Sequence, residues 1–191
     1  LSSLADTALE VTEGARRVAQ SRAYRDGLVE LQDASSQAAI AQLEIPEGAR
    51  VLDLCAGGGG KTLAMAGRAK ARFFAHDVDA GRMRDLPIRA KRAGVDVRCL
   101  DKAEVKGEAP YDLVFCDVPC SGSGTWRRTP DAKWRFDEAD LLSLLPIQAQ
   151  ILDLLARLCR EKGTALVLIT HNLGIVARYA ARVNVMYSGR I

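Results

Sequence analysis

Residues 51–62, with the sequence VLDLCAGGGGKT, carry the clearest set of groups for binding a small molecule. An apolar run of strand type leads into four consecutive glycines, Gly57 to Gly60, and a helical pattern begins at Lys61. Glycine lets the backbone approach a ligand closely, and the start of a helix offers free N–H groups. The stretch therefore predicts a strand, a ligand-binding loop and a helix.

Three kinds of ligand compete for this loop. A phosphate-binding P-loop requires GxxxxGK followed by Ser or Thr, but its first glycine would fall on Cys55. A dinucleotide fingerprint requires GxGxxG, but its third glycine would fall on Thr62 or Leu63. S-adenosylmethionine carries no phosphate, so a loop without a phosphate cradle suits it. A tight turn without a ligand is the remaining alternative, although four consecutive glycines carry an entropic penalty.

Four predicted strands each end in a residue that can contact a ligand: Cys55, Asp77, Asp101 and Asp117. Strands that alternate with helices predict a parallel α/β sheet, in which ligands bind beyond the carboxyl ends of the strands. We expect Asp77 to hold the ribose hydroxyls of S-adenosylmethionine. Any one of these aspartates alone would more simply be a solvated turn residue, so the prediction depends on all four ends together.

A second candidate centre follows Asp117, where Cys120 lies in a loop rich in glycine and serine. A thiol beside a methyl donor suggests methylation of a pyrimidine at C5, because thiolate addition to C6 makes C5 nucleophilic. Asp117 would favour that addition by hydrogen-bonding the base. Arg127, Arg128 and Lys133 are interleaved with tryptophans and predict contact with RNA. Solvated basic residues beside core tryptophans are the alternative.

The elements that must position these groups are read from the hydrophobic pattern. Asp33 or Ser35 would cap the first predicted helix, and Pro87 would kink or restart the third. Helices are expected at about 36–43, 61–69 and 79–93, and strands at 28–31, 51–55, 72–75, 95–100 and 112–116.

Composition fits one domain with a real core, because the chain has 191 residues, 48% hydrophobic and 27% charged. The net charge of +3 permits RNA contact without requiring it. Five cysteines without a CxxC pair, and two histidines, argue against a metal site and favour a reduced, cytoplasmic setting. No apolar run is long enough for a membrane span. Because the chain begins at Leu1, we expect a piece of a longer protein.

These motifs resemble those of the RsmB/NOP (Sun/Fmu) RNA 5-methylcytosine methyltransferases over about residues 22–155. The matching stretches are QDASSQ at 32–37, the glycine loop, DVPCSGSG at 117–124 and RRTPDAKW at 127–134. Gly58 stands where the family usually has proline. The resemblance implies an α/β, class I S-adenosylmethionine-dependent methyltransferase fold, that is, a Rossmann-like sheet with helices on both faces.

The resemblance also implies an activity, methylation of cytosine C5 in RNA, with ribosomal RNA as the expected partner. S-adenosyl-L-methionine would be bound by residues of the loop and of the strand ends: Cys55, Ala56, Gly57, Gly58, Gly59, Gly60, Lys61, Asp77, Asp101 and Asp117. In the family, the cysteine that matches Cys120 assists product release, and the nucleophile lies in a later Thr-Cys pair. That pair reads Thr170-His171 here. The change predicts either catalysis by Cys120 with Asp117, or an inactive protein that binds cofactor or RNA.

The tail from about residue 148 resembles the switch-histidine region of peptide-type ABC transporter ATPases, which suggests a chimera, natural or artificial. We therefore expect three segments: a lead-in at 1–30 left from an upstream region, a methyltransferase catalytic core at 31–160, and a strand–helix–strand tail at 161–191. The tail's first strand would be 165–169. A fragment of an ABC transporter ATPase is the less favoured alternative, because Walker A, Walker B and signature motifs are absent.

Overall fold

The computed structural model describes residues 5–117, 152–153, 155–157, 159–170 and 173–185. Helical backbone runs through the described residues between 152 and 162. The other elements, in chain order, are η1 (Ala15–Gln20), α1 (Arg22–Arg25), α2 (Ala34–Ala41), β1 (Arg50–Asp53), α3 (Gly60–Ala66), β2 (Arg72–Ala75), η2 (Ala80–Met83), α4 (Leu86–Ala93), β3 (Val97–Cys99), α5 (Lys102–Gly107), β4 (Leu113–Asp117), β5 (Ala165–Ile169) and α8 (Leu173–Tyr179).

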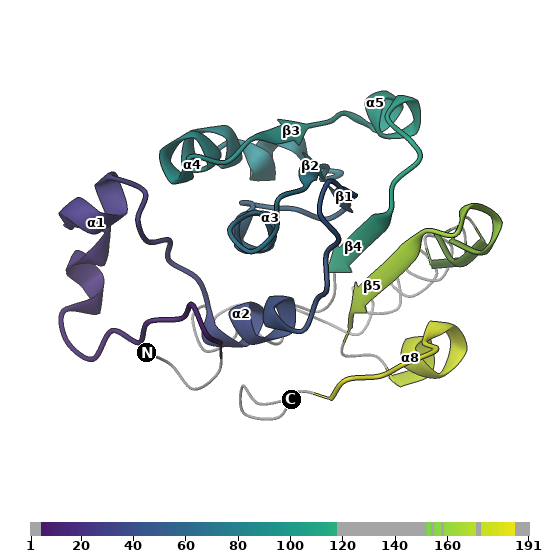
Figure 1. The fold of residues 1–191 in the computed structure, drawn as a ribbon, viewed down its shortest axis with the longest axis horizontal. Helices are drawn as coiled ribbons and strands as arrows, with labels where there is room; N and C mark the ends of the chain where they lie inside the picture. Colours follow the sequence, from purple (N-terminus) through teal and green to yellow (C-terminus); the bar gives the residue numbers. More distant parts are fainter. Residues whose placement is uncertain (1–4, 118–151, 154, 158, 171–172, 186–191) are drawn as a thin grey trace, which may run out of the picture.

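The described strands form one sheet in the order β3-β2-β1-β4-β5, and all neighbouring pairs are parallel (Figure 1). From β1 the chain moves outward to β2 and β3, and then returns to place β4 on the other side of β1. The direction of winding therefore reverses between β1 and β4. Ligands of open α/β sheets bind at such a switch point, beyond the carboxyl ends of the strands.

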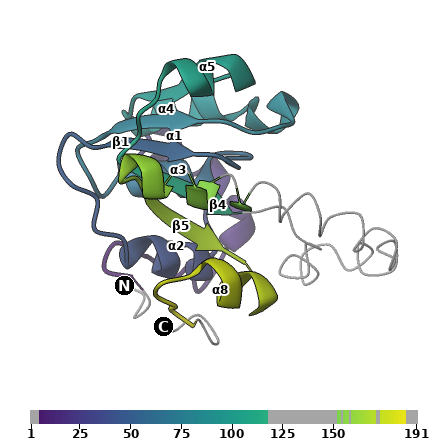
Figure 2. The same cartoon turned by 90° about the vertical axis from the view of Figure 1, so that its right-hand side faces the viewer.

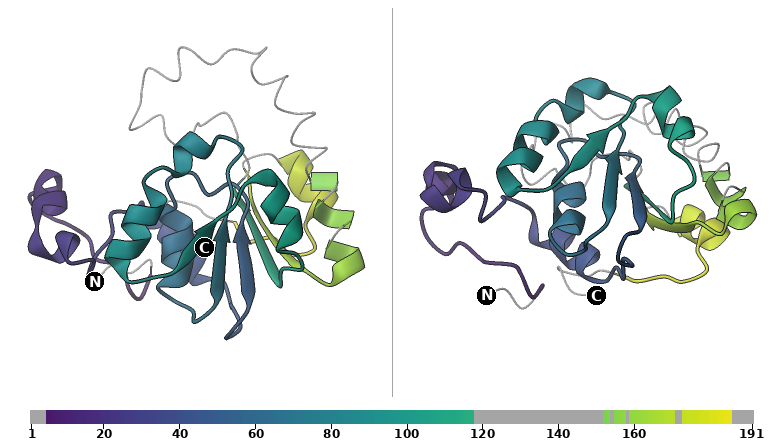
Figure 3. Two further views of the ribbon diagram at one scale, coloured as in Figure 1. Left: turned by 90° about the horizontal axis from the view of Figure 1, so that it is seen from above. Right: turned by 45° about the horizontal axis from the view of Figure 1, so that its top comes forward.

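Helices cover both faces of the sheet, as the family resemblance implied (Figures 2 and 3). Side chains that alternate along the strands pack against these helices. One face packs on α2 and α3 through Ile40, Ala49, Val51, Met65, Phe73, Leu113 and Phe115. The other packs on α8 and the helical residues near 152–155 through Leu52, Phe74, Leu100, Tyr111, Val114, Cys116, Leu152, Leu155 and Ile175. A buried layer thus lies against each face of the sheet beneath its carboxyl edge.

The basic helix predicted at 79–93 is divided into two. Asp79 caps η2 by accepting a hydrogen bond from the Gly81 N–H at 2.9 Å. Pro87 lies in the first turn of α4, where no intrahelical N–H donor is needed. The proline therefore restarts the helix, one of the two outcomes that the sequence predicted.

The strand predicted at 28–31 is absent, because no strand in the described part of the chain pairs with this segment. Instead, Glu30 forms ion pairs with Arg89 and Arg92 of α4, and the Arg92 guanidinium lies 3.9 Å from the centre of the Tyr24 ring. Asp33 caps α2 by accepting from the Ser35 N–H at 3.0 Å, as predicted. The contacts of Glu30 and Tyr24 anchor α1 and the segment after it to α4, at one side of the molecule (Figure 3).

The tail contributes a strand to the same sheet. β5 pairs with β4 over five positions, from Leu113 opposite Ala165 to Asp117 opposite Ile169. α8 follows and buries Ile175 against the sheet. The second tail strand is not found in residues 180–185, and residues 186–191 lie outside the described part. Among the described helices, none combines the length and apolar character needed to cross a bilayer.

Candidate cofactor-binding site

The glycine loop is held against the end of β2. The Ala56 N–H donates to the His76 carbonyl at 3.0 Å, and the Gly57 N–H donates to Asp77 Oδ2 at 2.9 Å. Gly59 has φ 78°, and a Cβ added there would lie 2.2 Å from Leu86 Cδ1. This position therefore requires glycine both for its left-handed backbone and for the close approach of α4.

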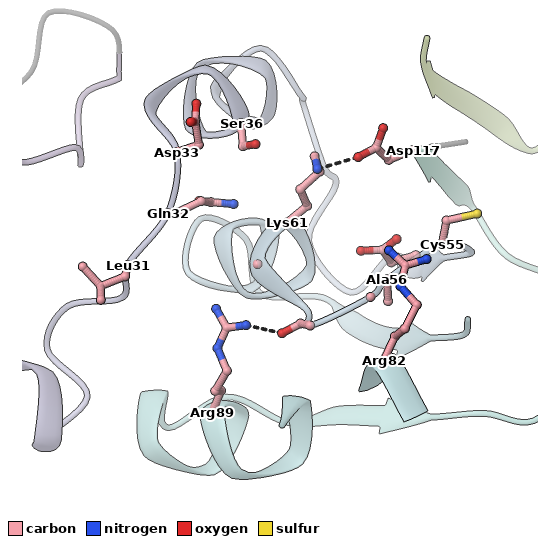
Figure 4. Close-up of a pocket in the computed structure, with 14 residues that line it drawn as sticks. Leu31, Gln32, Asp33, Ser36, Cys55, Ala56, Lys61, Arg82, Arg89 and Asp117 are labelled. Carbon is pink, nitrogen blue, oxygen red and sulfur yellow. Dashed lines mark hydrogen bonds and ion pairs between the residues drawn. The ribbon is translucent and has the colours of Figure 1, made fainter. Parts of the chain in front are cut away.

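A pocket of about 360 Å³ opens beside the loop, at the carboxyl ends of β1 and β4 (Figure 4). Its volume lies within the range of small-molecule sites. The lining residues come from the segment before α2, from α2, β1, the loop, α3, η2, α4 and β4: Leu31, Gln32, Asp33, Ser36, Asp53, Cys55, Ala56, Gly57, Gly58, Gly60, Lys61, Arg82, Arg89 and Asp117. Most of the predicted cofactor residues of the loop are therefore brought together here.

An ion pair crosses the pocket. Lys61 Nζ, in the first turn of α3, lies 2.6 Å from Asp117 Oδ2 at the end of β4. Both side chains are partly exposed, at 24% and 33%. Figure 4 shows the lysine directed across the pocket toward the aspartate. The pair offers a cation and an anion side by side, which is the charge pattern that an amino-acid zwitterion can match.

Asp53 places a buried carboxylate at the floor of the pocket. It is 1% exposed, and its Oδ2 accepts a hydrogen bond from Thr62 Oγ1 at 2.7 Å. Its Oδ1 has no hydrogen-bond partner among the described residues. Burial raises the pKa of Asp53 to about 6. An acceptor left unpaired in a pocket is suited to a ligand that brings its own N–H or O–H donor.

Asp77 is buried, and its carboxylate accepts a hydrogen bond from the glycine loop. Its Oδ2 accepts from the Gly57 N–H, its Oδ1 accepts from the Asp79 N–H at 3.0 Å, and Arg82 Nη1 lies 3.4 Å from Oδ2. Asp77 is not among the residues that line the pocket. The structure therefore assigns it a part in shaping the loop, and its contact with a cofactor stays a prediction.

Asp101 and Gly59 also lie outside the pocket lining. Asp101 caps α5 by accepting from the Ala103 and Glu104 N–H groups, both at 2.8 Å, while Glu104 accepts from the Asp101 N–H. Of the remaining predicted site residues, Cys120, Arg127, Arg128 and Lys133, together with His171, lie outside the described part of the chain.

Several lining residues were not predicted as site residues from the sequence. Asp53 lies in an apolar strand, and a carboxylate inside such an apolar run could have indicated a site residue. Gln32 belongs to the QDASSQ motif, and its Nε2 is buried without a partner among the described residues. Arg89 donates to the Gly58 carbonyl from α4. Its place depends on packing between distant segments, which spacing along the chain does not reveal.

Curated proteins similar to this chain include ribosomal RNA methyltransferases. The ribosomal RNA small subunit methyltransferase B of Klebsiella pneumoniae is 36% identical over 153 residues, which cover 74% of this chain and 34% of that protein. Its counterpart from Enterobacter sp. is 38% identical over 142 residues, with 68% and 32% covered. The chain thus spans about a third of the length of these curated relatives.

Solved structures show the same fold. The crystal structure of PH0851 matches with a TM-score of 0.64 and 34% identity, over 70% of this chain and 32% of that one. A methyltransferase homolog protein from Pyrococcus horikoshii matches with a TM-score of 0.50 and 32% identity, over 60% and 39%.

A family model covers most of the chain. The model of 16S rRNA methyltransferase RsmB/F matches residues 40–174, which include the glycine loop, the whole described sheet and the start of α8. The predicted Rossmann-like class I methyltransferase fold is confirmed by the parallel sheet with helices on both faces and by these matches. The chain therefore belongs to the 16S rRNA methyltransferase RsmB/F family.

Proposed function

We propose that this chain binds S-adenosylmethionine in the pocket between β1 and β4, and forms the donor-binding part of an RNA cytosine-C5 methyltransferase that acts on ribosomal RNA. One observation carries the proposal. At the switch point of the sheet, a glycine loop without a phosphate cradle meets the paired charges of Lys61 and Asp117. Membership of the RsmB/F family and the names of the relatives support the choice of RNA as substrate.

The residues of the pocket fit the donor. S-adenosylmethionine carries an α-ammonium and an α-carboxylate at one end and adenosine at the other, with no phosphate between them. Lys61 would hold the carboxylate, and the unpaired Oδ1 of Asp53 would accept from the ammonium. Exposed Gly58 and half-buried Gly60 leave the backbone open to the ligand. Asp77 and Asp101, at the ends of the next two strands, would serve the sugar and the base.

The chain's own residues would prepare the cytosine. The bound donor would supply an electrophilic methyl group. The Cys120 thiolate would add to C6 of the base, which makes C5 nucleophilic, and Asp117 would stabilise the adduct by a hydrogen bond to the base. Loss of the C5 proton to a base would then release the thiol. Arg127, Arg128 and Lys133 would hold the RNA phosphates nearby.

Turnover depends on whether one thiol suffices. The family's Thr-Cys nucleophile is replaced by Thr170-His171, so Cys120 would act alone in this chain. A protein that binds the donor or RNA without turnover is the second candidate, and this replacement is the observation that favours it. A fragment of an ABC transporter ATPase has less support, because the glycine loop fits no phosphate site.

Calorimetry and a methyl-transfer assay test these proposals on the full chain. We expect S-adenosylmethionine and S-adenosylhomocysteine to bind with a stoichiometry of one, and ATP not to bind. Protein with a labelled donor and small-subunit ribosomal RNA should then label cytosine at C5, and Cys120→Ser should abolish the label. Donor binding without any label would support the second candidate. ATP binding in place of the donor would overturn the proposed function.

A further inference from the structure

We propose that Cys55 and Cys116 form a redox-sensitive dithiol, in which a hydroperoxide converts the two thiols into a disulfide that weakens cofactor binding. The two Sγ atoms lie 3.9 Å apart, and both cysteines are free in the structure. Cys55 lines the pocket, whereas Cys116 is not among the lining residues and lies buried in β4. The effect on the cofactor rests on the proposed function, but formation of the disulfide does not.

The backbone keeps the two cysteines close to each other. Cys55 follows β1 by two residues, and Cys116 lies in β4, the strand that pairs with β1. The Leu54 N–H still donates to the Phe115 carbonyl at 2.9 Å, so the two segments stay hydrogen-bonded up to the residue before each cysteine. The sulfur atoms need to approach by about 2 Å to reach bonding distance. Figure 4 shows the Cys55 thiol directed toward the strand that carries Asp117.

The two thiols differ in exposure and in pKa. The difference suits a pair in which one thiol is oxidised first and the other then forms the disulfide with it. Cys55 is half-buried at the pocket, so a small peroxide reaches it, whereas Cys116 is 0% exposed. The hydrogen bond from Cys116 lowers the pKa of Cys55, and the same contact together with burial raises the pKa of Cys116. Thiolate character and access therefore coincide at Cys55, which is where oxidation begins.

The reaction balances with a hydroperoxide as the oxidant. The Cys55 thiolate attacks the terminal peroxide oxygen, the O–O bond breaks, and Cys55 becomes a sulfenic acid while an alcohol or water leaves. Cys116 then attacks the Cys55 sulfur, its proton leaves with the hydroxyl as water, and the S–S bond forms. Cys116 needs no access to solvent, because its partner sulfur is already in contact. Two thiols lose two electrons, and one peroxide gains them.

Oxidation would act on the cofactor through the loop. Cys55 directly precedes Ala56, whose N–H fixes the start of the glycine loop to the His76 carbonyl. Drawing the Cys55 sulfur toward β4 therefore strains the segment that positions Gly57 and Gly58. Disulfides in reducing compartments are mainly transient and redox-sensing, which fits a reversible device rather than a structural staple.

Mass spectrometry of the full chain after hydrogen peroxide treatment tests the inference, with peptide mapping under non-reducing conditions. We expect a loss of two hydrogen atoms, a peptide that joins Cys55 to Cys116, and full reversal by dithiothreitol. Calorimetry of the oxidised chain should show S-adenosylmethionine binding at least about fivefold weaker, the low end of ordinary coupling between sites. By the same coupling, added donor should disfavour the disulfide.

Matched variants keep the result interpretable. Cys99→Ser and Cys159→Ser should leave the disulfide unchanged, since no sulfur contact is found for either among the described residues. Cys116→Val keeps an apolar core side chain and should let excess peroxide carry Cys55 on to sulfinic acid. A disulfide between Cys55 and Cys120, or Cys55 oxidised to sulfinic acid in the unmodified chain while Cys116 stays a thiol, would overturn the inference. If the reduced chain binds no donor but still forms the disulfide, only the proposed function fails.

Discussion

The Lys61 ammonium lies 2.6 Å from Asp117 Oδ2, and this ion pair joins the first turn of α3 to the end of β4. The helix dipole disfavours a cation at a helix N-terminus, so Lys61 does not stabilise α3 through the dipole. Asp117 compensates for that opposition. The lysine is therefore held at the pocket by its partner on β4 and not by α3, which is the pattern expected of a ligand-binding residue.

Lys61→Met should weaken S-adenosylmethionine binding about tenfold or more, because a charged hydrogen bond to the ligand carboxylate is lost. Calorimetry measures the change, and Lys70→Met is the matched control, since the Lys70 side chain is exposed and lines no part of the pocket. Asp117→Asn and the double variant complete a cycle that separates ligand contact from loss of the ion pair. A Lys61→Met protein that binds within twofold of the parent would contradict the assignment.

Asp53 should make folding stability fall as pH rises from about 4 to about 6. Burial raises the folded-state pKa of Asp53 to about 6, above the ordinary value of about 3.9, so the folded state binds this proton more tightly than the unfolded state does. The stabilising contribution is therefore complete below pH 4 and is lost through pH 6. It amounts to about 3 kcal/mol in the free energy of unfolding.

Urea unfolding of the parent and of Asp53→Asn across this range measures that contribution. The difference between the two proteins is needed, because the Arg50 guanidinium lowers the pKa of Glu108 and this works in the opposite direction. Asparagine keeps an oxygen that can accept from Thr62 Oγ1. Relative to the parent, the variant should gain stability as pH rises. A difference that stays flat between pH 4 and 7 would show that Asp53 titrates normally.

Gly59→Ala should destabilise the chain more than Gly48→Ala. Both glycines have φ 78°, so each substitution adds the same backbone strain of about 1–2 kcal/mol. A Cβ at Gly59 also lies 2.2 Å from Leu86 Cδ1, whereas one at Gly48 meets nothing within 4 Å. The extra overlap should add about 1–3 kcal/mol, as overpacking in cores does. Urea midpoints of the two variants measure it, and equal losses would mean that α4 shifts freely.

The sequence predicted much of the sheet because its strands are short apolar runs between turn signals. The strand at 72–75 was predicted with its observed bounds, and the strand at 95–100 was found shortened to Val97–Cys99. The strand at 28–31 was wrong, since an apolar run becomes a strand only where a neighbour can pair with it. That segment contacts α4 instead, through the ion pairs that Glu30 forms with Arg89 and Arg92.

The candidate site could be predicted where its residues lie close together in the chain. The loop from Cys55 to Lys61 lies at the pocket because a strand, a turn and a helix must follow one another there. Arg89 and Gln32 reach the same pocket from α4 and from the segment before α2, and no spacing in the chain reveals that meeting. Asp77 was placed at the correct strand end, but only the structure shows its carboxylate occupied by the Gly57 and Asp79 N–H groups.

Hydrogen exchange should show β5 to be a genuine part of the sheet. β5 pairs with β4 along its whole length, the Ala165 N–H donates to the Asp112 carbonyl at 2.9 Å, and α8 buries Ile175 behind it. The amides of β5 that pair with β4 should therefore exchange about as slowly as those of β3, the strand at the opposite edge. Residues 183–185, which are exposed and outside any helix or strand, should exchange at once and serve as the internal control. If the β5 amides also exchange fully within seconds, the tail is not integrated into the methyltransferase sheet. The segment that resembles an ABC transporter ATPase would then not fold together with the rest of the chain.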